Sequence, residues 1–208
     1  ITAEVRNCHF LSNTYSSGAG VRNDGGTLTV NDCLFEEQLA YGTGGGLLNF
    51  SGATTVTSCI FTDNWGREGA GCANIYGTLS LTNCILAKNE SNGGGALHGQ
   101  HDGSTHVTNC VITDNLWYQY GQPVGVVLAD DHNLVVVNSI VWENEGSENV
   151  LYGNATATIT YTLIGGGFGD AGDNNVDADP LFNDPVNGDY RLSRISPCLD
   201  IGTAVSAP

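Results

Sequence analysis

The chain repeats itself about every 25 residues, and this period restricts the folds available to it more than any other feature. Five cysteines recur at spacings of 25, 26, 25 and 26 residues, and Ser139 and Thr162 continue the series. An aliphatic residue stands three positions before each cysteine, and Phe, Leu or Ile stands two positions after it. The five cysteines are Cys8, Cys33, Cys59, Cys84 and Cys110.

The pattern within each repeat predicts the architecture. Apolar and polar residues alternate around each cysteine, which is typical of a strand with one buried face. A single short strand cannot bury that face, but copies stacked about 4.8 Å apart share one core. A unit of this length is too short for a βαβ unit, which needs about 30 residues or more. We therefore expect an all-β, right-handed parallel β-helix (β-solenoid) of about seven rungs over residues 1–164, with a C-terminal capping segment over residues 165–208.

Equivalent residues of successive rungs are expected to stack into ladders. The cysteine column fits an inward ladder of small residues, although a disulfide framework or a metal site is also conceivable, and the count of seven is odd. Asparagines at a corner can bond the amide of the next rung. One amide column is predicted at Asn13, Asn64, Asn89, Asn115 and Asn144, with Gln38 as a variant. A second is predicted at Asn23, Asn49 and Asn74, with His98 as a variant.

Short motifs in the rungs resemble a known repeat family. Phe10-Leu-Ser-Asn13 and Phe61-Thr-Asp-Asn64 resemble the FxxN half of polymorphic outer-membrane protein repeats, and Gly45-Gly-Leu-Leu48 and Gly94-Gly-Ala-Leu97 resemble the GGA(I/L/V) half. The stretch from Asp177 to Gly202 is similar to the segment that ends bacterial β-helix proteins of the choice-of-anchor class. The resemblance implies a bacterial surface or secreted protein, often an adhesin, and related β-helices also include polysaccharide lyases and hydrolases.

The amino-acid composition limits the classes of molecule that this protein is expected to bind. The formal net charge is −16, which argues against nucleic acid and against an anionic membrane surface. No stretch of about 18 apolar residues is present, so we expect no membrane insertion by this segment. The first residue is Ile1 and the opening residues already read as strand, so removal of an upstream segment and secretion to the extracellular space or cell surface are expected.

Two sets of acidic residues are candidates for a functional site, one for catalysis and one for calcium binding. Asp63 and Asp114 lie two rungs apart, roughly 10 Å, near the upper limit for an inverting acid–base pair, and Lys88 lies between them. If the protein is an enzyme, these three residues are the predicted catalytic groups; a surface charge ladder is the alternative reading. Asp170, Asp173, Asp177 and Asp179 form an oxygen-rich cluster that could bind calcium, although a capping loop of Asp and Asn turns explains it equally.

Aromatic side chains follow the asparagine corner in several rungs. If Tyr15, Tyr41, Trp65 and Trp117 stack along one edge, they could bind sugar rings or a protein partner; otherwise they pack against loops.

The sequence is compatible with three functions. The first is a non-catalytic structural or adhesive module, which could associate with itself end to end as a filament. The others are a polysaccharide-active enzyme and a calcium-dependent glycan-binding module.

Overall fold

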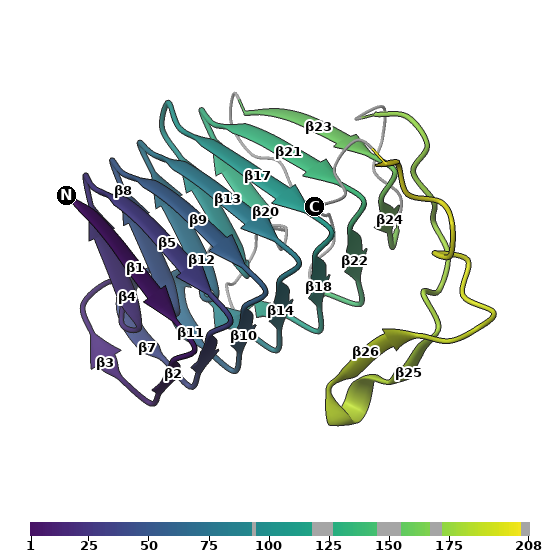
Figure 1. The fold of residues 1–208 in the computed structure, drawn as a ribbon, viewed down its shortest axis with the longest axis horizontal. Helices are drawn as coiled ribbons and strands as arrows, with labels where there is room; N and C mark the ends of the chain where they lie inside the picture. The colour runs from purple at the N-terminus through teal and green to yellow at the C-terminus, as the bar shows by residue number, and fades with distance from the viewer. Residues whose placement is uncertain (93–94, 118–126, 145–154, 167–171, 205–208) are drawn as a thin grey trace.

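The computed structural model describes residues 1–92, 95–117, 127–144, 155–166 and 172–204. Its strands form four parallel sheets that wind around one core (Figure 1). Sheet A contains β1 (Thr2–Arg6), β5 (Thr27–Asn31), β9 (Ala53–Thr57), β13 (Thr78–Thr82), β17 (Ser104–Thr108), β21 (Asn133–Val137) and β23 (Thr156–Thr160). Sheet B contains β2 (His9–Leu11), β6 (Leu34–Glu36), β10 (Ile60–Thr62), β14 (Ile85–Ala87), β18 (Val111–Thr113), β22 (Ile140–Trp142) and β24 (Leu163–Ile164).

The two remaining parallel sheets are shorter. Sheet C contains β3 (Thr14–Tyr15), β7 (Leu39–Thr43), β11 (Trp65–Glu68), β15 (Glu90–Ser91) and β19 (Leu116–Trp117). Sheet D contains β4 (Val21–Asp24), β8 (Leu47–Phe50), β12 (Cys72–Ile75), β16 (Leu97–Gln100) and β20 (Val127–Asp130). The predicted parallel β-solenoid is therefore confirmed, with five turns that have strands in all four sheets and two further rungs with strands in sheets A and B among the described residues.

The core consists of columns of equivalent side chains in register. In sheet A, Val5 pairs with Val30 and Val30 with Val56, and the column continues to Ile159. In sheet B the rings of Phe10, Phe35 and Phe61 stack with centroids 4.7 and 4.5 Å apart. From Val30 and Phe35 onward, these inward residues are almost completely buried. Because the side-chain period of a strand is 2, a slip of one residue would expose the whole set, so the columns fix the register.

The C-terminal segment has two parts with different positions. Residues 173–177 run beside the last rung, where Val176 donates its backbone N–H to the Thr162 carbonyl and accepts from the Ile164 N–H. The chain then forms an antiparallel hairpin of β25 (Phe182–Asp184), the 3-10 helix η1 (Pro185–Asn187) and β26 (Asp189–Leu192). We call residues 178–204 the C-terminal arm. The hairpin of the arm lies below β18 and β22, and the rest of the arm runs past the last rung near β24 (Figure 1).

Within the described residues, no helix has both the length and the apolar character needed to cross a membrane.

Candidate functional site

The first amide ladder runs along the corner between sheets B and C. Its side chains donate from one rung to the next: Asn64 to Asn89 at 2.8 Å, Asn89 to Asn115 at 2.9 Å, and Asn115 to Asn144 at 2.9 Å. Asn13 joins the ladder by donating to the Gln38 side-chain oxygen at 2.8 Å. Asn64, Asn89 and Asn115 are buried, so each amide needs these bonds to satisfy its polar atoms.

The second ladder follows sheet D and ends in a different residue from the one expected. Asn23 donates to Asn49 at 3.0 Å, and Asn49 donates to Asn74 at 2.8 Å. The prediction that His98 continues the column is wrong, because Asn74 pairs with Gly99 and His98 pairs with Ala73. His132 takes the place of the missing amide: its ring lies over Gly99, with Nε2 2.9 Å from the Thr105 hydroxyl and 3.4 Å from the Asn74 amide.

The cysteine column lies inside the solenoid and is joined by backbone contacts. The Cys33 N–H lies 3.4 Å from the Cys59 sulfur, and the Cys84 N–H lies 3.4 Å from the Cys110 sulfur. Ser139 continues the column by accepting from the Cys110 N–H at 3.1 Å. All seven cysteines are unpaired, and Cys8 alone among them is exposed. Burial raises the pKa of the Cys59 thiol to about 12, which keeps it protonated and chemically inert.

The three predicted catalytic residues lie in one column under the C-terminal arm. Each has a left-handed backbone, with φ of 54° at Asp63, 56° at Lys88 and 54° at Asp114. Lys88 donates to the Val186 carbonyl at 3.2 Å, and Asp114 accepts from the Tyr190 hydroxyl at 3.1 Å. Burial, together with the charges of Asp114 and Asp63, raises the pKa of Tyr190, so its hydroxyl stays protonated and donates. The column thus anchors the arm to the solenoid.

The carboxylates of the predicted calcium cluster bond backbone groups. The Asp177 side chain accepts from the Gly166 N–H at 3.2 Å, and the Asp179 side chain accepts from the Leu181 N–H at 2.8 Å. The Asp173 backbone carbonyl accepts from the Tyr161 N–H, and Asp170 lies outside the described residues. In the part of the chain that the structure describes, no group of three or more His, Cys, Asp or Glu side chains could hold a metal ion.

Of the two interpretations of these aromatic residues, the structure rules out a stacked row along one edge. Tyr15 pairs with Ala40 in the next rung, and Trp65 pairs with Leu39 and Glu90. Trp117 shares the column of Tyr15, but pairs with Ser91 and lies four rungs away, and its side chain is outside the described set. Tyr41 is 67% exposed and lies beyond both columns. These four residues therefore form no common platform.

A different aromatic column lies at the corner between sheets D and A. The Tyr76 ring stacks on the His101 ring with centroids 4.2 Å apart and an interplanar angle of 12°. Phe50 meets Tyr76 edge to face at 6.0 Å. Sequence reasoning missed this column, although Phe50 follows Asn49 directly and Tyr76 follows Asn74 by two residues. The signal was therefore available in the residues that follow the second amide ladder.

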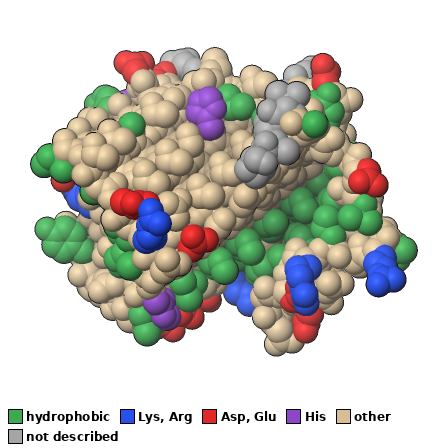
Figure 2. Space-filling model, in the orientation of Figure 1, with side chains coloured by type: hydrophobic (Ala, Val, Ile, Leu, Met, Phe, Trp, Pro, Cys, Tyr) green, Lys and Arg blue, Asp and Glu red, His purple; other side chains and the backbone are tan. Residues whose placement is uncertain are grey.

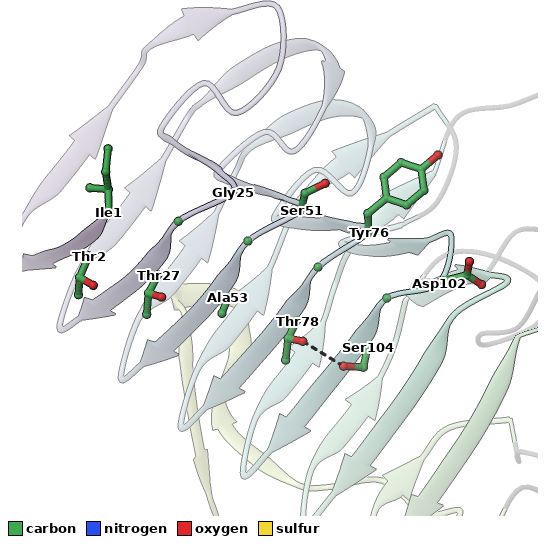
Figure 3. Close-up of a pocket in the computed structure, with 14 residues that line it drawn as sticks. Ile1, Thr2, Gly25, Thr27, Ser51, Ala53, Tyr76, Thr78, Asp102 and Ser104 are labelled. Carbon is green, nitrogen blue, oxygen red and sulfur yellow. Dashed lines mark hydrogen bonds between the residues drawn. The ribbon is translucent and has the colours of Figure 1, made fainter.

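The aromatic column borders an open groove of about 550 Å³ along the same corner (Figure 3). Its floor is a row of glycines, and its sides carry small or hydroxyl-bearing residues together with Tyr76 and Asp102. The lining consists of Ile1, Thr2, Gly25, Gly26, Thr27, Ser51, Gly52, Ala53, Tyr76, Gly77, Thr78, Asp102, Gly103 and Ser104. The glycines are needed by the second ladder, because a Cβ at Gly52 or Gly77 would collide with the Asn23 or Asn49 amide.

A second hollow lies between the arm and sheet B. It has a volume of about 350 Å³ and is lined by Trp142, Phe182 and other residues of both elements. Figure 2 shows apolar side chains gathered along this boundary. Sheet B has an outward apolar row, in which Ile60 pairs with Ile85 and Val111 pairs with Ile140. Ala87 and Thr113 lie on the same face, next to the residues that bond the arm, and are buried.

Comparison with known proteins gives one match. The family model described as "Right handed beta helix region" matches residues 44–171, which is more than half of the chain. No curated protein and no solved structure matches the chain.

Proposed function

This chain belongs to the right-handed β-helix family, and we propose that it is a non-catalytic extracellular module with a structural or adhesive role. One observation carries the proposal: Lys88 and Asp114, which the sequence offers as catalytic groups, are bonded to the C-terminal arm. An acid–base pair needs room for a sugar and a water between its carboxylates. Here Tyr190 of the arm packs against that column instead.

The buried thiols are compatible with the extracellular location that we propose. Six of the seven cysteines are at least partly buried, and desolvation raises the pKa of Cys33, Cys59 and Cys72, so these thiols resist oxidation without forming disulfides. The repeat motifs in the sequence point to the same compartment. Detection of the protein in the medium or on intact cells of its source, and its absence from the cytosol, would test this part of the proposal.

The absence of catalysis is tested on polysaccharides. The full chain is incubated with neutral and uronate polymers, and reducing ends and the absorbance of unsaturated ends are followed. We expect no turnover above that of a heat-denatured sample. Turnover that disappears in Asp114→Asn, while the melting temperature is retained, would show that the column is an active site and would overturn the proposal.

Self-association is proposed through the first rung alone. Residues 173–177 occupy the edge of the last rung, whereas the outer edge of β1 has no partner among the described residues. An uncovered edge presents backbone donors and acceptors that a second copy can pair with. For residues 1–208 by themselves, we therefore expect dimers that form with rising concentration in light scattering, and not long filaments. A chain that stays monomeric at millimolar concentration would contradict this part.

A further inference from the structure

We propose that the groove between sheets D and A binds a neutral polysaccharide, with one sugar ring stacked on Tyr76. This inference rests on the proposed function as a non-catalytic adhesive module, and names the ligand class for it. The groove and the aromatic column are on the opposite side of the solenoid wall from the core, and the column under the arm takes no part in them.

The aromatic column contains a step in side-chain size. Backbone bonds place Gly25, Ser51, Tyr76 and His101 at equivalent positions of four successive rungs. His101 stacks on one face of the Tyr76 ring, whereas Ser51 and Gly25, at the equivalent positions of the two preceding rungs, carry no ring that could stack on Tyr76 in the same way. Tyr76 is consequently 52% exposed. The result is a partly exposed tyrosine ring beside the open groove, which we call the ledge, and Phe50 meets this ring edge to face.

Such a ledge fits the carbon–hydrogen face of a pyranose ring. Aromatic faces carry partial negative charge and attract polarised C–H groups, while the ring removes apolar surface from water. Tyr76 also has a left-handed backbone, with φ of 59°, an uncommon conformation for a bulky residue. Because the Tyr76 ring is already held against His101, stacking of a sugar costs little side-chain entropy.

The rest of the lining offers hydrogen bonds that suit sugar hydroxyls. Thr27, Thr78 and Ser104 line up at the starts of β5, β13 and β17, and the Thr78 and Ser104 hydroxyls lie 3.5 Å apart (Figure 3). A hydroxyl both donates and accepts, so it matches either role of a sugar hydroxyl. The lined stretch spans four rung intervals, about 19 Å at about 4.8 Å each, which accommodates several sugar units. This length favours a polymer over a single sugar.

The charge of the site selects neutral chains. Among the described residues that line the groove there is no lysine or arginine, and the one charged side chain is the Asp102 carboxylate. The nearby Arg22 is held by Asp24 through two bonds of 2.9 Å and lies over the Phe50 ring. With a net charge of −16 the protein also repels polyanions at a distance. Uronate and sulfated polymers are therefore disfavoured.

The test uses the full chain and two sets of probes. Retention on insoluble cellulose, chitin and xylan is compared with binding to polygalacturonate and alginate, and reducing ends are measured in the same samples. Tyr76→Ala removes the ledge. Ser51→Tyr covers it, because a tyrosine at φ of 55° would stack on Tyr76 as Tyr76 stacks on His101. Tyr41→Ala is the matched control, since it removes a tyrosine of similar exposure from sheet C.

We expect the unmodified protein to bind at least one neutral polymer without cleaving it, and to ignore the two acidic ones. Tyr76→Ala and Ser51→Tyr should each weaken binding about tenfold, while Tyr41→Ala leaves it unchanged. No retention on any neutral polymer, or equal losses in Tyr76→Ala and Tyr41→Ala, overturns the inference but leaves the non-catalytic function standing. Polymer cleavage overturns the proposed function instead. Circular dichroism spectra matching the unmodified protein show that each variant is folded.

Discussion

The junction of the second amide ladder with His132 gives a prediction whose size follows from the structure. Gly99 pairs with Asn74 on one side, and the His132 ring fills the space above it. A Cβ built on Gly99 would lie 2.5 Å from His132 Cδ2 and 2.8 Å from Nε2. Carbon atoms in contact need about 3.5 Å. The ring would therefore have to move by about an ångström, away from Thr105 and Asn74.

The cost of Gly99→Ala has two parts. An added methyl in a packed core costs about 1–3 kcal/mol through strain. Loss of the 2.9 Å contact between His132 and Thr105 costs about 1 kcal/mol more. We therefore expect the free energy of unfolding to fall by about 2–4 kcal/mol, although alanine usually favours the folded chain over glycine by lowering the entropy of the unfolded state.

The measurement is urea unfolding at neutral pH, followed by circular dichroism. Gly202→Ala is the control, because a Cβ there meets its nearest atom at 3.4 Å, an ordinary contact, and should change the stability by less than about 0.5 kcal/mol. His132→Ala should lower the stability by itself, but it also removes the clash. The double variant should lose less stability than the sum of the losses in the two single variants, by about 1 kcal/mol or more. Costs that simply add would refute this account of the junction.

Three further predictions concern single groups. Burial lowers the pKa of His132 below its ordinary 6.5. The stability that neutral His132 contributes is therefore present above pH 6.5 and is lost as the pH falls below it, because the unfolded chain binds the proton first. In urea unfolding, His132→Asn should lose less stability between about pH 7.5 and 5 than the unmodified protein. Tyr190→Phe removes the bond to Asp114, and should speed tryptic cleavage at Arg191 and Arg194 of the arm several-fold, whereas Tyr41→Phe should not. Thiol labelling of the native protein should modify Cys8 quickly, Cys198 slowly and the five remaining thiols only after unfolding, and rapid labelling of Cys59 would contradict its burial.

The repeating part of the fold was predictable because its signal is local and recurs. Equivalent residues around the cysteines had to lie in register, and the pairs Val30–Val56 and Phe35–Phe61 do so. The prediction for His98 was wrong because it matched the last glycine of each cluster, Gly71 with Gly95. In the structure Gly71 lies beside Ala96, so the residues that follow are displaced by one position and Gly99 takes the place expected for His98. In these two rungs, counting 13 residues from Cys59 to Cys72 and from Cys84 to Leu97 gives the observed pair.

The arm could not be placed from the sequence, because it has no period and its contacts are remote. Tyr190 and Asp114 are 76 residues apart in the chain, and Lys88 and Val186 are 98 apart. Two aspartates and a lysine at equivalent positions read equally well as an active site, a charge ladder or an anchor. Only the placement of the hairpin distinguishes these possibilities, since it supplies the tyrosine hydroxyl and the carbonyl that the column bonds.

In a solenoid, function is most readily built where a column changes its side-chain size. A column of equal side chains covers each ring with the next, as Phe35 covers Phe61 inside the core, and leaves only edges for a ligand. The step from Ser51 to Tyr76 leaves the Tyr76 ring without a stacked side chain at the equivalent position of the preceding rung, and Tyr76 is 52% exposed. Because the amide ladder beneath the groove holds the register of both rungs, the width of that ledge is fixed by the rung spacing of about 4.8 Å and not by a mobile loop. Covering the Tyr76 ring with Ser51→Tyr should therefore weaken binding, while the ladder, and with it the stability, is retained.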